Sequence, residues 1–145
     1  TKTMISRAFL LGIGLALAAS PSLAHSPPSK SGGASAAPVF EQGLPNVPGK
    51  TMTSVLVRYA PGGKSPPHTH SRTAFVWAYV LSGSIRSQVN GGPVKVYRAG
   101  ESWFEEPGAH HQVSENASKT RPASLLAVFV ADSGDRNLTI YEQEK

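Results

Sequence analysis

The most informative segment of the chain is PPHTHSRTAFVWAYVLSG, residues 66 to 83. Two prolines precede the pair His68 and His70, and a long apolar run follows it and ends at Gly83. Residues at positions i and i+2 of an extended segment point to the same face, so two imidazole rings can converge on one metal ion. An HxH pair by itself also fits a solvated turn, so the remainder of the chain has to decide between the two.

Outside this stretch the chain alternates between short segments of high β-propensity and turn residues. The sequence predicts eight strands, at residues 51–59, 75–81, 84–90, 94–97, 102–104, 112–114, 125–130 and 138–141. Asn90-Gly91 predicts a hairpin turn, because both residue types tolerate a positive φ. No helical periodicity of useful length is present after the N-terminal segment. The pattern therefore predicts one all-β domain, a sandwich or a barrel.

A second pair of histidines, His110 and His111, follows about forty residues after the first. Adjacent residues of a strand face opposite ways, so only one of these two can join His68 and His70. Three neutral imidazoles on the inside of a barrel would form a metal site with open coordination positions.

The spacing of these residues resembles the two motifs of the cupin superfamily. Gly62, five residues, His68-Thr69-His70 and a strand to Gly83 are similar to the first motif. Gly100, five residues and Glu106-Pro107-Gly108-Ala109-His110-His111 are similar to the second. The resemblance implies an all-β, cupin-type double-stranded β-helix, which is a jelly-roll barrel, as a single domain. It also implies that the metal ligands are His68, His70 and His111.

The sequence departs from the family at the acidic ligand. Cupins usually carry a glutamate a few residues after the second histidine, where this chain has Val76, and no Asp or Glu occurs between Glu41 and Glu101. Either three histidines alone hold the metal, or a glutamate before His111, Glu105 or Glu106, occupies the vacant position. Glu105 would equally fit an exposed acid. Two further residues are candidates for contact with the ligands or the bound molecule, His110 and Gln88, and Gln88 would equally fit an outward polar position.

The expected cofactor is one divalent metal ion. Three imidazoles favour Fe, Zn, Cu or Ni over Mn, which prefers oxygen ligands. The predicted function is an oxygenase-like metalloenzyme that acts on a small molecule. A cupin module that binds a small molecule or a metal without turnover is the alternative.

The N-terminal residues predict export. Lys2 and Arg7, an apolar run at residues 8–19 and small residues at 22–24 have the layout of a signal peptide cleaved after Ala24. The segment 25–48, rich in Pro, Gly and Ser, predicts a flexible leader, and 49–145 the barrel. The mature protein would be periplasmic or secreted, without stable membrane association. As in many cupins, a homodimer is expected.

The charge of the chain gives no sign of a nucleic-acid partner. Without Lys2 and Arg7, 12 of the 14 basic residues remain against 9 acidic ones, a net charge of +3. The basic residues are scattered and are not interleaved with aromatic ones, so we expect no nucleic-acid binding. The absence of cysteine excludes a disulfide framework.

Overall fold

The computed structural model of the protein describes residues 29–142, and within them all regular secondary structure is β. The strands are β1 (Ser29–Ser31), β2 (Ala34–Gly43), β3 (Lys50–Tyr59), β4 (Lys64–Ser65), β5 (His68–His70), β6 (Phe75–Ser82), β7 (Ser84–Val89), β8 (Lys95–Arg98), β9 (Ser102–Glu105), β10 (His110–Asn116), β11 (Ala123–Asp132) and β12 (Thr139–Tyr141). No helix in this part of the chain has the length and hydrophobicity that a membrane span requires. The expectation of an all-β fold is confirmed.

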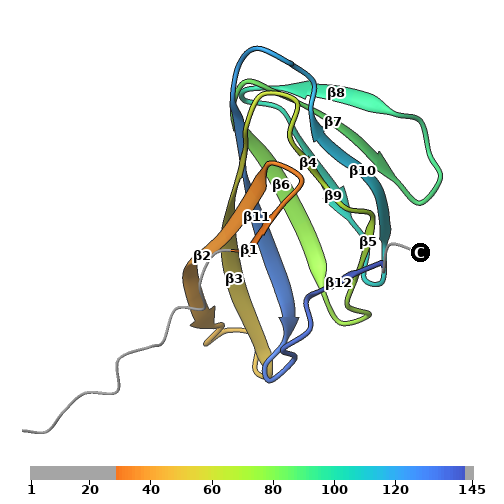
Figure 1. Cartoon of the computed structure of the whole chain (residues 1–145). Helices are drawn as coiled ribbons and strands as arrows, with labels where there is room; N and C mark the ends of the chain where they lie inside the picture. The colour runs from red at the N-terminus through yellow and green to blue at the C-terminus, as the bar shows by residue number, and fades with distance from the viewer. Residues whose placement is uncertain (1–28, 143–145) are drawn as a thin grey trace, which may run out of the picture.

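The strands form two antiparallel sheets that face each other (Figure 1). One sheet has the order β1-β2-β3-β11-β6-β9, and the other has the order β12-β5-β10-β7-β8 with β4 paired to β10. Strands alternate between buried and exposed residues, most regularly in β6, β9 and β11. The inward side chains pack into one core that contains Val76, Val80, Ile85, Leu125 and Phe129.

The turns that the glycines predicted are present. Asn90 and Gly91 have φ values of 52° and 68° in the turn between β7 and β8. Gly83 has a φ of 70° between β6 and β7, and a Cβ there would lie 2.7 Å from the Pro122 carbonyl oxygen. Glycine is therefore required at Gly83 both by its backbone conformation and by the close approach of the neighbouring chain.

The structure corrects the expectation of a flexible leader for the part of residues 25–48 that it describes, from residue 29 onward. Residues 34–43 form β2, which pairs with β3 in a register from Ala34 opposite Tyr59 to Gly43 opposite Thr51. The low β-propensity of Ser, Ala and Pro is overridden because the edge of β3 offers a complete row of backbone partners. The register shifts between Pro38 and Phe40, which accommodates the proline next to the edge of the sheet. The predicted signal peptide, residues 1–24, lies outside the described residues.

Candidate metal centre

Three histidines come together between the two sheets. His68 and His70 lie on β5, and His111 lies on β10, where it is paired directly with His68. All three are buried, and one ligand nitrogen from each lies within 4.8 Å of the others. The sequence prediction that these three residues converge is thus confirmed as a geometric cluster.

Backbone carbonyl oxygens orient the rings of His68 and His70 through their Nδ1 atoms. Nδ1 of His68 lies 2.8 Å from the Pro66 carbonyl oxygen, and Nδ1 of His70 lies 3.2 Å from the Leu138 carbonyl oxygen. A carbonyl oxygen only accepts hydrogen bonds, so Nδ1 of His68 carries the hydrogen. Nδ1 of His70 also lies 3.2 Å from Oγ1 of Thr139, which can donate or accept, and it carries the hydrogen when it donates to the Leu138 carbonyl oxygen. In the neutral rings this leaves the Nε2 lone pairs free for the cluster, which is how metal-binding histidines are usually oriented.

Glu105 completes the cluster from the opposite sheet. It is 2% exposed and lies directly across from Val76 in the pairing of β6 with β9. Its Oε2 is 3.1 Å from Nε2 of His70, and its Oε1 is 3.2 Å from Nδ1 of His111. Trp103 donates a hydrogen bond of 3.0 Å from Nε1 to Oε1. Glu106, by contrast, is exposed.

One contact in this cluster suits a cation. Glu105 Oε2 is buried and has no hydrogen-bond partner, although Nε2 of His70 lies 3.1 Å from it. With the hydrogen of a neutral His70 on Nδ1, this contact brings two acceptors to 3.1 Å of each other. A proton or a metal ion between them would remove the repulsion. The residues present therefore fit a bound divalent cation.

The protonation states also suit a cation. Burial lowers the pKa of His111 to about 4 and lowers the pKa of His68. Burial alone would raise the pKa of Glu105, but contacts with His70, His111 and Trp103 bring that pKa below its usual value. At neutral pH, His68 and His111 therefore offer free lone pairs and Glu105 offers a negative charge.

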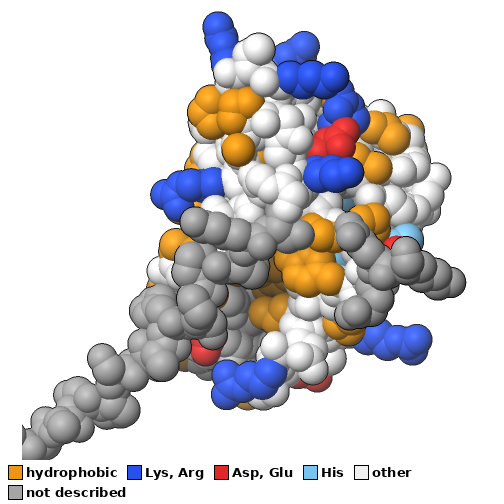
Figure 2. Space-filling view, in the orientation of Figure 1, with side chains coloured by type: hydrophobic (Ala, Val, Ile, Leu, Met, Phe, Trp, Pro, Cys, Tyr) orange, Lys and Arg blue, Asp and Glu red, His pale blue; other side chains and the backbone are white. Residues whose placement is uncertain are grey.

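The cluster forms one wall of a cavity of about 130 Å³ that lies between the sheets and is partly open to solvent. The rest of the wall is mostly apolar and includes Val55, Val57, Leu125 and Phe129. Its polar part consists mainly of hydroxyl groups, contributed by Tyr59, Ser65, Ser114, Thr139 and Tyr141. In the space-filling view, hydrophobic side chains occupy the centre of the face between the sheets, and Lys and Arg lie around its periphery (Figure 2).

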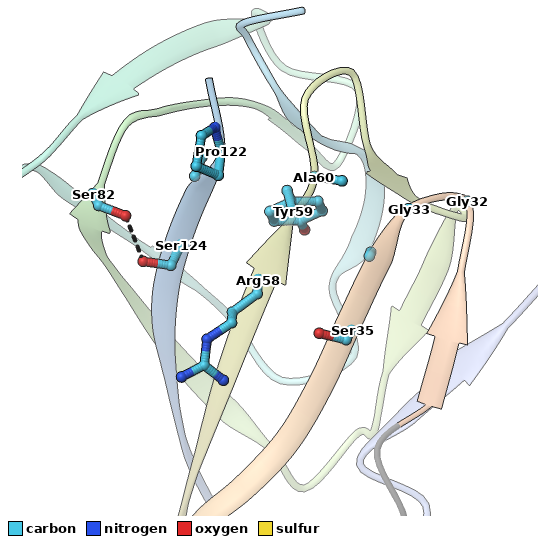
Figure 3. A pocket seen from close by; sticks show the side chains of 11 residues that line it. Gly32, Gly33, Ser35, Arg58, Tyr59, Ala60, Ser82, Pro122 and Ser124 are labelled. Carbon is cyan, nitrogen blue, oxygen red and sulfur yellow. Dashed lines mark hydrogen bonds between the residues drawn. The ribbon is translucent and has the colours of Figure 1, made fainter. Parts of the chain in front are cut away.

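A larger hollow, of about 690 Å³, contains none of the histidines. It lies beside the turn at Gly32 and Gly33, with Arg58 between Ser35 and Ser124 on neighbouring strands (Figure 3). Ser82 and Ser124 form a hydrogen bond of 2.7 Å there. Arg58 is the one charged residue that lines this hollow, and no acid or histidine does. The histidine cluster is therefore the better candidate for a functional site.

Two of the candidate site residues are not in the cluster. His110 faces away, with its Nε2 2.5 Å from Oε1 of Glu142, as the alternation of side chains along β10 requires. Gln88 does not line the cavity, because its amide donates to the Gly92 carbonyl oxygen at 2.9 Å. The structure thus shows no contact of Gln88 with the cluster or the cavity.

Sequence reasoning missed the residue next to Gln88. Ser87 is buried, and its Oγ lies 2.9 Å from Nε2 of His111. The signal was available in the alternation of β7, because Ser87 shares the inward face with Ile85.

The model of the family "Cupin domain" matches residues 55–129, which include the three histidines and Glu105. The chain belongs to the cupin superfamily. Among curated proteins, this cupin is 36% identical over 90 residues to Germin-like protein subfamily 2 member 2 of Arabidopsis thaliana, a match that covers 57% of the chain and 40% of that relative. It is 35% identical over 77 residues to Germin-like protein subfamily 2 member 4 of the same plant, covering 50% of the chain and 34% of the relative. The match thus spans two fifths or less of each germin-like protein.

Solved structures show the same fold. An oxalate oxidase in complex with the substrate analogue glycolate is 25% identical, with a TM-score of 0.57 over 78% of this cupin and 57% of that chain. An RmlC-like cupin from Shewanella frigidimarina is 20% identical, with a TM-score of 0.55 over 77% of this chain and 88% of the other. At that identity the second likeness concerns the fold alone.

Proposed function

We propose that this cupin binds one divalent metal ion through His68, His70 and His111 and uses it in an oxygenase-like reaction on a small molecule. The observation that carries the proposal is the convergence of the three buried histidines, with ligand nitrogens within 4.8 Å of one another, beside the buried carboxylate of Glu105, whose Oε2 has no hydrogen-bond partner. When bound, such an ion would polarise a substrate oxygen or support redox chemistry with dioxygen.

Glu105 is proposed as the fourth ligand. It takes over from the neighbouring strand the role that the family gives to the position near Val76, since these two residues are directly paired. A carboxylate in the ligand set changes the expected metal. Imidazole ligands alone disfavour Mn(II), but a carboxylate oxygen suits it, so with Glu105 included we place Mn(II) beside Fe(II) among the metals to be tested.

Other residues of the chain orient the histidine rings and shield the site. The carbonyl oxygens of Pro66 and Leu138 orient two of the rings, and Ser87 contacts the third. Burial of the site between the sheets excludes bulk water. The similarity to a solved oxalate oxidase supports an oxidative reaction. A module that binds without turnover remains the second candidate, because one fold serves many functions.

Metal analysis of the protein purified without a histidine tag tests the first part of the proposal. We expect about one equivalent of metal per chain. A preparation that neither contains nor takes up Fe, Mn, Zn, Cu or Ni would refute the metal site. Oxygen consumption by the Fe- or Mn-loaded protein with small oxygenated organic molecules distinguishes the enzyme from the module. Saturable binding without turnover would favour the module.

We also propose that the protein is exported, on the basis of the N-terminal pattern of basic, apolar and small residues. N-terminal sequencing of the native protein should give His25 as its first residue. An intact N-terminal segment in the mature protein would contradict export by cleavage.

A homodimer is proposed from the outer face of β6 and β9. Trp77 is 40% exposed and Phe104 is 59% exposed, and the two are paired across the strands. Phe75 stacks on Phe104 with ring centroids 5.8 Å apart. Exposed aromatic clusters are typical of protein interfaces. Light scattering should give the mass of a dimer for the wild type and of a monomer for Trp77→Arg, while Val39→Arg on β2 should remain dimeric. A monomeric wild type would refute this interface.

A further inference from the structure

The cavity beside the histidine cluster offers the evidence for a substrate class, an inference that rests on the proposed function. Its described lining residues include no Lys, Arg, Asn or Gln, and the one charged side chain apart from the histidines is Glu105. An anionic group away from the metal would therefore meet apolar walls and a carboxylate. The transfer of an unpaired charge into such surroundings is costly.

A cluster of three hydroxyl groups supplies the polar feature of the wall. Oη of Tyr59 lies 2.7 Å from Oγ of Ser114 and 3.0 Å from Oγ of Ser65. Tyr59 is 2% exposed, and all three residues line the cavity. We call Tyr59, Ser65 and Ser114 the hydroxyl trio.

The trio has a hydrogen to spare. Three hydroxyl groups carry three hydrogens, and the two hydrogen bonds among them use two. Whichever group donates in each bond, one hydrogen remains for an acceptor on a bound molecule. Tyr59 and Ser114 are buried and Ser65 is half-buried, so a ligand that brings an oxygen acceptor gives the remaining hydrogen a partner inside the cavity.

The size of the cavity limits the ligand further. A cavity of about 130 Å³ is close to the engineered apolar cavity of about 150 Å³ that binds benzene, so it holds about one six-membered ring. We propose that the substrate is a compact, uncharged molecule with an apolar body and an oxygen acceptor that binds the hydroxyl trio. A small dicarboxylate such as oxalate does not fit this description.

The test measures the binding of matched probes to the metal-loaded protein by calorimetry. Phenol supplies the ring with one oxygen, which can bind the metal. Resorcinol and hydroquinone add a second oxygen that can reach the trio but cannot chelate a metal together with the first. We expect at least one of the two to bind between about twofold and tenfold more tightly than phenol, the usual range for one hydrogen bond. Oxalate should bind more weakly than phenol.

A variant without the trio attributes the difference to these residues. In Tyr59→Phe/Ser65→Ala/Ser114→Ala the preference over phenol should disappear, while metal content and phenol affinity persist. Replacement of all partners by apolar groups of similar shape is expected to be tolerated. The control Ser82→Ala/Ser124→Ala removes a hydroxyl pair outside the cavity and should retain the preference.

The outcomes separate the two proposals. Absence of metal uptake by the wild type would refute the proposed function itself. Normal metal uptake would leave that function standing, and the substrate class would then be overturned by either of two results. One is tighter binding of oxalate than of every phenolic probe. The other is that the wild type shows no preference for resorcinol or hydroquinone over phenol, or that this preference persists in the variant without the trio. The wild-type measurements do not depend on the folding of any variant.

Discussion

Replacement of Glu105 by glutamine tests the fourth ligand directly, because it removes the charge and keeps the shape. The two carboxylate oxygens lie 3.1 and 3.2 Å from ring nitrogens of His70 and His111, so an ion held by those nitrogens is also beside the carboxylate. Glu105 is 2% exposed before any ion binds, so metal binding does not carry its desolvation cost.

The expected loss follows from these distances. Charges of +2 and −1 about 3 Å apart attract by about 11 kcal/mol gross at an effective dielectric constant of about 20. The neutral amide oxygen and entering water recover much of this. Removal of one partner from a buried charge pair costs about 3 kcal/mol or more in measured cases. The metal dissociation constant of Glu105→Gln should therefore rise by a factor of about 150 or more.

Competition with a chromophoric chelator at pH 7 measures this change. Glu106→Gln is the matched control, because the same substitution at the exposed neighbour should leave the dissociation constant within about twofold of wild type. The glutamine oxygen can still accept from Trp103, and its amide can donate to Nε2 of His70, so thermal unfolding of the metal-free variant should stay near that of the wild type. A dissociation constant for Glu105→Gln within about threefold of wild type would refute a direct role for this carboxylate in metal binding.

Three further results are expected. Elemental analysis should show metal in His110→Ala, whose ring faces Glu142, and its loss in each of His68→Ala, His70→Ala and His111→Ala; metal retained in all four would contradict the cluster. Because burial lowers the pKa of His111 to about 4, protons compete for the site only in acid, so equilibrium dialysis from pH 8 downward should show release as the pH falls through about 4. Release with a midpoint at pH 6.5 or above would show that burial does not depress this pKa. In urea unfolding, Ile85→Ala at a fully buried position should cost about 3 kcal/mol, whereas Ile140→Ala at 55% exposure should cost less than about 1 kcal/mol, and equal costs would contradict the assigned core.

The parts of the structure that sequence reasoning predicted are those with a local signal. Short runs of high β-propensity predicted β6 and β11, and Asn90-Gly91 predicted its turn, since these patterns act over a few residues. The alternation rule also predicted that only one residue of the second histidine pair would join the cluster. In contrast, β2 depends on backbone pairing with β3, and its own side chains carry little preference for a strand.

The hydroxyl trio was invisible in the sequence for the same reason. Tyr59, Ser65 and Ser114 lie on β3, β4 and β10, and they meet because β4 pairs with β10, with Ser65 opposite Ser114. No spacing along the chain connects these residues. Their common feature is a position on an inward face, which becomes informative only when the pairing of the strands is known.

The position of the acid shows what a motif can and cannot specify. In the sequence, the acidic ligand of the family is absent, because Val76 lies near the position that the family usually gives to a glutamate and cannot bind a metal. Counted across the sheet, the acid is one strand away, because Glu105 is the direct partner of Val76 and shares its inward face. Antiparallel partners of this kind place their Cβ atoms only about 5 Å apart, a distance that a glutamate side chain readily spans. A carboxylate on the neighbouring strand therefore reaches the rings of His70 and His111. With Glu105 as the proposed fourth ligand, the ligand set of such a barrel depends on strand register. A family motif that requires the acid on the first strand would classify this chain as a site of three histidines, with a different charge and a different preference among metals.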